Sequence, residues 1–337
     1  MIQNQVLLAP YTTLRVGGKA EYFCEVNDTA ALRAAVSWAK TKGYVITILG
    51  GGSNVLVSDA GVRGLVIRMC DSRVVFEEGD VYVRVTAHAG TILDTLVGDT
   101  VTRDLWGLEN LSAIPGTVGA VPVQNVGAYG VEAKDVIESV TVYDMASDEI
   151  RVLTNEACAF GYRDSYFKTA EGKSLVILSV TFLLTRAPNR KLSYKDLVEY
   201  FSNTTEPSLL EIRRGVTAIR SKKFPDWHTV GTAGSFFKNP RVREVRYQKL
   251  CTLFPELPGF PDGEGMVKLS LGWILDHVLH MKGVRKGHVG LYEKQALVLV
   301  GYEGATAADI NVFSTEIIDA VKARTGITVE REVQMIG

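Results

Sequence analysis

Residues 50–54 read GGGSN, and this glycine loop, Gly50–Asn54, narrows the choice of fold more than any other stretch of the chain. It follows Val45–Leu49, a short apolar run typical of a strand, and precedes a second predicted strand, Val55–Val57. Because glycine has no side chain, its backbone N–H group can approach an anion closely. Taken alone, the loop is either a phosphate-binding turn or a tight turn between two strands.

The two commonest phosphate-binding motifs do not fit. The dinucleotide motif G-x-G-x-x-G requires a glycine at position 55 and a helix directly after it, but that residue is Val55. A P-loop, G-x-x-x-x-G-K-[ST], would have to use Gly172–Ser174, and Phe167 stands where its first glycine belongs.

A second glycine stretch, Ile114–Gly130, reads IPGTVGAVPVQNVGAYG. It holds four glycines and two prolines but no charged side chain. A surface loop would be more polar, whereas this composition suits a backbone pressed against a large, partly apolar cofactor. We therefore expect the two glycine-rich segments to clamp an elongated dinucleotide.

Composition excludes several classes of protein. The 37 Lys and Arg residues nearly cancel the 38 Asp and Glu residues, so no excess charge indicates a nucleic-acid or membrane-surface partner. The four cysteines are far apart in the sequence, which is typical of reduced thiols rather than a disulfide framework. The N-terminus lacks a signal-peptide pattern, and no apolar run reaches the ~18–20 residues of a membrane span. We expect a soluble cytoplasmic protein of two or three domains.

Hydrophobic periodicity predicts three successive units. In the first, Asp28 caps a helix that Lys42-Gly43 stops. In the second, Val81, Val83 and Val85 alternate along one face of a strand. Further strands are predicted at 65–68, 136–144, 149–153, 174–184 and 296–300, and helices at 91–103, 207–222, 269–281 and 306–323. A last strand, Ile327–Val333, is too short to stand alone and must dock on an existing sheet.

Seven blocks, in order, resemble the UDP-N-acetylenolpyruvoylglucosamine reductase family, and the two glycine-rich segments resemble the FAD-binding domain of the vanillyl-alcohol-oxidase superfamily. The blocks are TTLRVGGKAEYF (Thr12–Phe23), GLENLSAIPGTVGA (Gly107–Ala120), FGYRDS (Phe160–Ser165), GTAGSFFKNP (Gly231–Pro240), KLSLGWILD (Lys268–Asp276), QALVLV (Gln295–Val300) and VEREVQMIG (Val329–Gly337).

The resemblance implies an α+β fold, with a two-lobed FAD-binding domain of the vanillyl-alcohol-oxidase type and a C-terminal α/β substrate-binding domain. It suggests the FAD-binding domain at 1–187 (lobes 1–70 and 71–187), a connecting segment and lid at 188–218, the substrate-binding domain at 219–326, and a terminal strand at 327–337 that returns to the flavin site.

The resemblance also implies an oxidoreductase with non-covalent FAD and NADPH as cofactors. The family reduces UDP-N-acetylglucosamine enolpyruvate to UDP-N-acetylmuramate in peptidoglycan synthesis, on which cell-wall biogenesis, cell shape and cell division depend. The expected partner is this small molecule, with no nucleic acid and no membrane insertion, and the expected state is a monomer.

Three residues match the family's catalytic positions. Hydride addition builds negative charge on the substrate carboxylate, so the site needs a cation or acid there and a proton donor nearby. Arg163 matches the cation, since a guanidinium offers a rigid donor fork. Glu332 matches the C-terminal acid and Ser235 the proton donor. Taken alone, Arg163 would be an ion-pair partner of Asp164, Ser235 a turn residue and Glu332 a solvated strand position.

The resemblance implies two further sets of residues. The cofactor-binding set is Gly50, Gly51, Gly52, Ser53, Asn54, Pro115, Gly116, Gly119, Asn125, Gly127, Ala128, Tyr129 and Arg220. The substrate-binding set is Tyr162, Tyr194, Lys223, Asn239, Lys282 and Gln295. Tyr194 resembles the tyrosine of a lid that closes over the UDP pyrophosphate, which assigns the chain to the lid-containing class. Two positions depart from that class, because Phe260 replaces its usual tyrosine and Thr12 its usual asparagine.

Two other functions are open to the residues. An oxidase of the same superfamily would reoxidise with oxygen, but many such oxidases tether flavin through a histidine near the glycine loop, and none is present there. A non-catalytic flavin or UDP-sugar sensor would have no use for the catalytic trio. His277 and His280 share a predicted helix face, but no third ligand accompanies them, so we expect no metal. Cys158 is predicted to be a small buried thiol.

Overall fold

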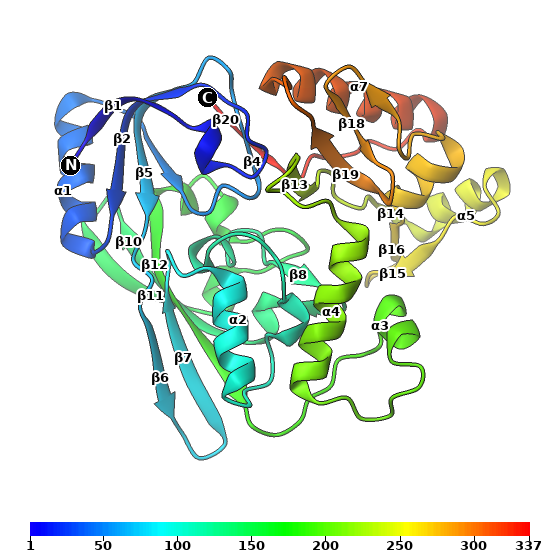
Figure 1. The fold of residues 1–337 in the computed structure, drawn as a ribbon, viewed down its shortest axis with the longest axis horizontal. Coiled ribbons are helices and arrows are strands. Elements are labelled where there is room, and N and C mark those ends of the chain that lie inside the picture. The colour runs from blue at the N-terminus through cyan, green and yellow to red at the C-terminus, as the bar shows by residue number, and fades with distance from the viewer. The chain divides into compact units, whose positions relative to one another are not determined.

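The computed structural model describes residues 1–337 (Figure 1). The chain divides into two compact units. Unit 1 comprises Met1–Val6, Ala20–Gly52 and Arg63–Arg220, and unit 2 comprises Leu7–Lys19, Ser53–Val62 and Ser221–Gly337. Each unit is therefore built from three separate segments of chain. One boundary falls inside the glycine loop, between Gly52 and Ser53.

The first sheet of unit 1 has four strands in the order β1-β2-β5-β3. Their bounds are Gln3–Leu7 (β1), Lys19–Val26 (β2), Ile46–Leu49 (β3) and Val62–Met69 (β5). Helix α1, Thr29–Lys42, lies against this sheet (Figure 1). As predicted, Asp28 caps it by accepting the N–H of Ala31 at 2.7 Å, and Gly43 ends it with a φ of 69°.

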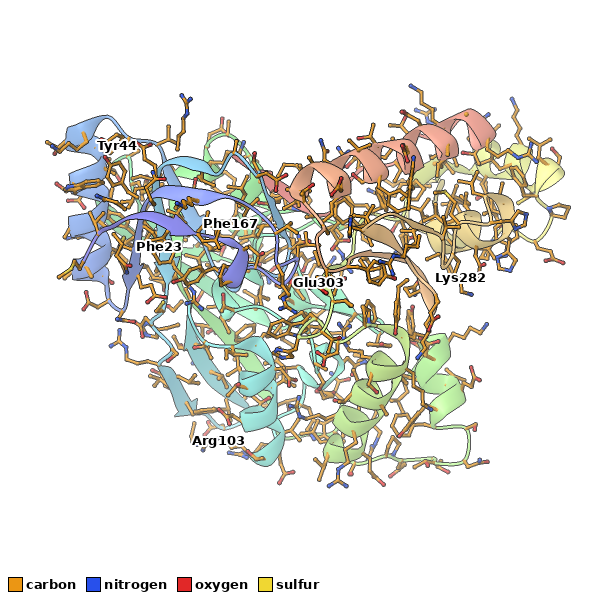
Figure 2. All side chains as sticks on the ribbon, turned by 45° about the horizontal axis from the view of Figure 1, so that its top comes forward. Phe23, Tyr44, Arg103, Phe167, Lys282 and Glu303 are labelled. Atoms are coloured by element: carbon orange, nitrogen blue, oxygen red, sulfur yellow. The ribbon has the colours of Figure 1, made fainter.

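Apolar side chains of α1 form the core beneath this sheet. Leu32, Ala35, Val36 and Ala39 are buried with residues of β2 and β5. An aromatic group extends this packing, since the Tyr22 ring lies 5.0 Å from that of Trp38 and 4.8 Å from that of Tyr44. Figure 2 shows Tyr44 beside α1.

The second sheet of unit 1 is antiparallel, in the order β11-β10-β12-β7-β6. Its strands are Val74–Glu78 (β6), Tyr82–His88 (β7), Ile137–Asp144 (β10), Glu149–Thr154 (β11) and Leu175–Thr185 (β12). Val176 and Leu178 of β12 are buried with α1, whereas Leu175 and Ile177, which alternate with them along the strand, belong to the other core of the unit. Both faces of β12 are therefore covered, which explains its long apolar sequence.

That other core lies beneath α2 (Leu93–Thr102) and α4 (Leu209–Lys223). Two expectations here were wrong by a few residues. Val81 is 65% exposed because β7 begins only at Tyr82. Helix α4 begins at Leu209 rather than at Pro207, because Ser208 and Glu211 bond each other's backbone N–H groups and cap it. A short helix, α3 (Lys195–Tyr200), precedes it.

Unit 2 contains three small sheets. The largest has the order β13-β19-β18-β17, and a three-stranded sheet has the order β14-β16-β15. Their strands are Gly231–Ser235 (β13), Arg241–Arg243 (β14), Gly259–Pro261 (β15), Met266–Leu269 (β16), Arg285–Lys286 (β17), Val289–Tyr292 (β18) and Gln295–Gly301 (β19). The third pairs β4 (Val55–Val57) with β20 (Gln334–Ile336), the red C-terminal strand in Figure 1.

Helices α5 (Glu244–Leu253) and α7 (Ala307–Thr325) complete unit 2. Two more expectations were wrong. In place of a regular helix over 269–281, a turn of α-helix (α6, Leu271–Trp273) continues as a π-helical turn over Ile274–Val278. In place of a strand over 327–333, the terminal strand is β20. The mixture of helices and largely antiparallel sheets confirms the predicted α+β class.

Candidate active site

The glycine loop and the second glycine stretch contact each other within unit 1. A Cβ atom placed on Gly51 would lie 2.8 Å from Gly116 Cα, and one on Gly50 would lie 2.7 Å from Thr117 Oγ1. Carbon atoms normally stay ~3.5–4.0 Å apart, so neither position has room for a side chain. Because the glycine loop and the second glycine stretch are in contact, a ligand cannot pass between them and has to bind along the edge that the two segments form together.

This edge carries the groups that a pyrophosphate needs. The N–H groups of Gly50, Gly51 and Gly52 take part in none of the protein's turn, loop or cap hydrogen bonds. Thr117 Oγ1 is buried and has no hydrogen-bond partner. A buried hydroxyl without a partner costs about 1–3 kcal/mol, which a bound anion would offset. The residues present therefore fit FAD, whose pyrophosphate they would hold.

An ion pair between Asp94 and Arg213 holds the backbone at the start of the second glycine stretch. Asp94 accepts Arg213 Nη1 at 2.7 Å and the Ala113 N–H at 2.6 Å. Burial would raise the pKa of Asp94, but the hydrogen bonds from Arg213 and Ala113 outweigh it and lower the pKa. Asp94 is thus an anion that fixes the backbone just before Pro115.

Arg220 is a partly buried cation beside the same backbone. Its Nε donates to the Ala113 carbonyl at 3.1 Å, and it also interacts with the Tyr129 hydroxyl. Burial lowers the pKa of Arg220 and raises the pKa of Tyr129 to about 12. A guanidinium stays protonated in proteins, so Arg220 can serve an anionic or electron-rich ligand at neutral pH.

Arg163 lies in a tight turn of unit 1. The Gly161 N–H donates to the Asp164 carbonyl at 3.0 Å, and Arg163 between them has a φ of 53°. This left-handed conformation costs a non-glycine residue about 1–2 kcal/mol. Arg163 Nη2 donates to the Gly127 carbonyl at 2.8 Å, so the guanidinium rests on the second glycine stretch. Strain of this kind is often retained at functional sites.

Asn125 links that turn to the second glycine stretch. Its Nδ2 donates to Glu132 Oε2 and to the Gly161 carbonyl, both at 3.0 Å, and its Oδ1 accepts the Lys134 N–H at 3.0 Å. Both amide hydrogens are thus used within the protein. The structural role of Asn125 is to hold the turn that carries Arg163, and its expected contact with the cofactor stays a prediction.

In unit 2, Ser235 and Glu332 lie on neighbouring backbone segments. Ser235 ends β13 after an irregularity at Gly234, whose φ is 72°. The Glu332 N–H donates to the Phe236 carbonyl at 2.9 Å, and Phe237 pairs with Arg331. Two of the three expected catalytic residues are therefore brought together by main-chain hydrogen bonds.

Three expected substrate-binding residues lie at α6 and the π-helical turn that follows it in unit 2. Asn239 Oδ1 accepts the Leu271 N–H at 3.0 Å, and Gln295 Oε1 lies beside Gly272, 3.3 Å from where a Cβ would stand. Lys282 pairs with Asp276 of the π-helical turn at 2.7 Å. Asn239 and Gln295 thus lie at α6 and Lys282 at the π-helical turn that continues it, and π-helical turns are frequent at functional sites.

The remaining substrate-binding candidates are more dispersed. Tyr194 directly precedes α3, is 45% exposed, and lies edge-on to Tyr129 with 5.3 Å between ring centroids. Tyr162 lies beside Arg163, with 5.7 Å between the ring centroid and the guanidinium carbon. Lys223 is the last residue of α4. Phe260, in β15, is 53% exposed.

The histidines and the thiol have ordinary surroundings. His277 stacks on Trp273 at 4.9 Å between ring centroids, and no group of three or more His, Cys, Asp or Glu side chains is arranged to hold a metal ion. Cys158 is buried, as predicted, and burial raises its pKa to about 11. No helix is both long and apolar enough to span a membrane.

A cavity of about 430 Å³ lies between α1 and the β10–β11 turn in unit 1. Its two cations are already engaged, Arg33 with Asp148 at 3.4 Å and Lys40 with the Met145 carbonyl. Since none of the expected site residues lines it, we do not assign a ligand to this cavity.

Comparison with known proteins extends over the whole chain. Residues 20–154 match the model of an FAD-binding domain, and residues 226–336 match that of the UDP-N-acetylenolpyruvoylglucosamine reductase C-terminal domain. The UDP-N-acetylenolpyruvoylglucosamine reductase of Pseudomonas aeruginosa is 40% identical over 335 residues, covering 98% of both chains. The protein of the same name from Bdellovibrio bacteriovorus is 40% identical over 333 residues, again 98% of both.

The chain belongs to the UDP-N-acetylenolpyruvoylglucosamine reductase family. The crystal structure of the family member from Thermus caldophilus has the same fold, with a TM-score of 0.70 at 25% identity over 100% of both chains. The predicted fold class and family are thereby confirmed. The protein is an oxidoreductase of this flavin-dependent reductase family with an FAD-binding domain, whereas the division at 187, 218 and 326 stays a prediction.

Sequence reasoning missed several residues that shape this family site. Asp94 and Arg213 hold the second glycine stretch, but they lie 119 residues apart and no local pattern joins them. Thr117 could have been noticed, because it is a hydroxyl inside a glycine-rich segment. The hydrogen bond from Asn54 Nδ2 to the Glu332 carbonyl, at 3.2 Å, joins residues 278 apart and leaves no trace in the sequence.

Proposed function

We propose that this protein uses NADPH and FAD to reduce UDP-N-acetylglucosamine enolpyruvate to UDP-N-acetylmuramate in the cytoplasm, as a monomer. The observation that carries the proposal is the 40% identity to the Pseudomonas aeruginosa reductase over 98% of both chains. The edge formed by the glycine loop and the second glycine stretch supports it, because the unbonded glycine N–H groups and Thr117 Oγ1 suit a pyrophosphate.

When bound, FAD would accept a hydride from NADPH and deliver it to the enolpyruvyl double bond. Arg163 would meet the substrate carboxylate with its guanidinium and stabilise the negative charge that hydride addition creates. Its backbone strain and its bond to the Gly127 carbonyl support a guanidinium that is oriented before the substrate arrives.

Glu332 and Ser235 would complete the chemistry. Glu332 would stabilise the same carboxylate through a hydrogen bond. The Ser235 hydroxyl would give its proton to the carbon next to the hydride acceptor once negative charge has formed there. The bond from Glu332 N–H to Phe236 supports their joint action, since it fixes Glu332 beside the residue that follows Ser235.

The substrate-binding roles follow the resemblance. Lys282, Asn239 and Gln295 would contact the UDP-sugar, Tyr194 would close over its pyrophosphate, Tyr162 would contribute beside Arg163, and Lys223 would also meet the nicotinamide cofactor. The position of the first three at α6 and the π-helical turn that continues it supports their roles. The exposure of Tyr194 is compatible with a residue that moves.

The test is a sequence of colour changes. Purified protein should be yellow, and denaturation should release the flavin. NADPH should bleach it without oxygen, and UDP-N-acetylglucosamine enolpyruvate should then restore the colour anaerobically. A protein that stays colourless after FAD addition would refute the proposal. Recolouring by oxygen alone would favour an oxidase, and failure to bleach with NADPH would favour a sensor.

A further inference from the structure

Asn54 connects the glycine loop to the segment that carries Glu332. Its Nδ2 donates to the Glu332 carbonyl at 3.2 Å, and its own carbonyl accepts the Gln334 N–H at 3.0 Å. The Glu332 N–H is bonded to Phe236. Both backbone groups of Glu332 are thus held, one by the residue after Ser235 and the other by the last residue of the glycine loop.

The rest of the terminal segment is anchored independently of this contact. Strand β20 pairs in parallel with β4, and the Ser58 N–H donates to the Ile336 carbonyl at 2.8 Å. On the other side, Arg331 Nε donates to Ser314 Oγ at 3.0 Å and its Nη2 to Thr315 Oγ1 at 2.6 Å. The side chain of Asn54 therefore fixes only the orientation of the Glu332 carbonyl, in a segment that other contacts already hold in place.

We propose that Asn54 is a positioning residue for Glu332 and that through it the binding of FAD orders the acid that acts on the substrate. The inference rests on the proposed function. Gly52 and Asn54 are two residues apart, so a pyrophosphate that fixes the glycine N–H groups also fixes the amide that holds Glu332. Because coupling between sites is reciprocal, an ordered Glu332 segment must in turn favour FAD binding.

Two variants isolate the side-chain contact. Asn54→Ala removes the donor, and Asn54→Asp keeps the shape but sets a carboxylate against the Glu332 carbonyl. The main-chain bond from Gln334 to residue 54 remains in both. The matched control is Glu330→Gln, in the same segment, whose side chain is 72% exposed and forms only a surface pair with Lys238.

Hydrogen exchange is the first measurement and needs no substrate. In the parent and in Glu330→Gln, FAD should slow exchange of the Glu332 and Val333 amides, on either side of the residue that Asn54 holds, at least tenfold. In both Asn54 variants, at FAD concentrations that saturate each of them, the slowing should be less than twofold. Equal protection of the segment in parent and variants would overturn the inference, and so would a parent whose segment does not respond to FAD.

The second measurement separates the two half-reactions in anaerobic stopped flow, again with each variant saturated in FAD. Because Asn54 is also an expected cofactor-binding residue, the two steps are compared with each other: recolouring by substrate should slow about tenfold more than bleaching by NADPH does. If both steps fall equally, Asn54 acts on the flavin alone and the inference fails. If the parent itself does not recolour, the proposed function fails, and the exchange experiment still decides the coupling between Asn54 and Glu332.

Discussion

Gly51→Ala uses a single methyl group to test the close approach of the glycine loop to the second glycine stretch. The backbone of Gly51 is not left-handed, so alanine can adopt its conformation, and the effect is purely steric. The added Cβ would lie 2.8 Å from Gly116 Cα. Reaching an ordinary contact of ~3.5–4.0 Å requires the two backbones to part by roughly 0.7–1.2 Å.

Overpacking of this kind costs about 1–3 kcal/mol. If FAD requires the two backbones at their present separation, the same free energy is lost from binding. With RT near 0.59 kcal/mol, this corresponds to an FAD dissociation constant about 5–150-fold higher. The assay is quenching of FAD fluorescence on titration with apoprotein, together with urea unfolding of the apoprotein.

The control is Ser37→Ala on the exposed face of α1, which adds no atom to a packed site. It should change the free energy of unfolding by no more than about 0.5 kcal/mol and leave FAD affinity unchanged. The reasoning about the edge would be refuted if Gly51→Ala bound FAD within twofold of the parent and unfolded at the same urea concentration.

Three further changes probe other parts of the protein. Ser235→Ala should leave bleaching by NADPH intact but slow recolouring by substrate about 10²–10⁴-fold. Ser37→Ala, on the exposed face of α1, should leave both steps unchanged, and equal recolouring in the two variants would remove Ser235 from its role. Glu109 is 2% exposed and burial raises its pKa, so its ionisation destabilises the fold once the pH exceeds the pKa of an ordinary glutamate. Glu109→Gln should therefore raise the free energy of unfolding in urea at pH 8, and this gain should shrink towards pH 5. A gain that grows on acidification would contradict this. Asp59 accepts the N–H groups of Ala307 and Ala308 at 2.9 and 2.8 Å, so Asp59→Ala should lower the free energy of unfolding by about 1–2 kcal/mol, and no change would show that α7 does not need this second cap.

Local signals in the sequence predicted local structure well. Helix α1 is recoverable because its cap, its apolar spacing and its stop at Gly43 lie within 16 residues, from 28 to 43. The glycines at 50 and 51 are explained by local packing, since the close approach of the second glycine stretch leaves no room for a side chain there.

Periodicity failed where burial and hydrogen bonding diverge. Ile327, Val329 and Val333 are all buried, so their alternation was a true signal of burial, yet the ladder forms only at Gln334–Ile336, whose side chains are polar or partly exposed. The spacing of Leu271, Ile274 and Leu275 suggested a regular helix, but the Leu279 N–H donates to the Ile274 carbonyl, five residues back, which widens the turn. Contacts such as Asp94 with Arg213 depend on tertiary structure alone.

The three-segment composition of unit 2 bears on how the protein can be made and dissected. Strand β4 is synthesised well before its partner β20, which lies 279 residues further along the chain, from 55 to 334. During synthesis β4, which follows the glycine loop, therefore stays unpaired until the C-terminal strand has been made. Exposed strand edges of this kind are prone to aggregate. For the same reason a fragment limited to residues 226–336 would lack Leu14, Val16 and Leu56 of its own core, and we expect it to be insoluble unless residues 7–19 and 53–62 are supplied as well.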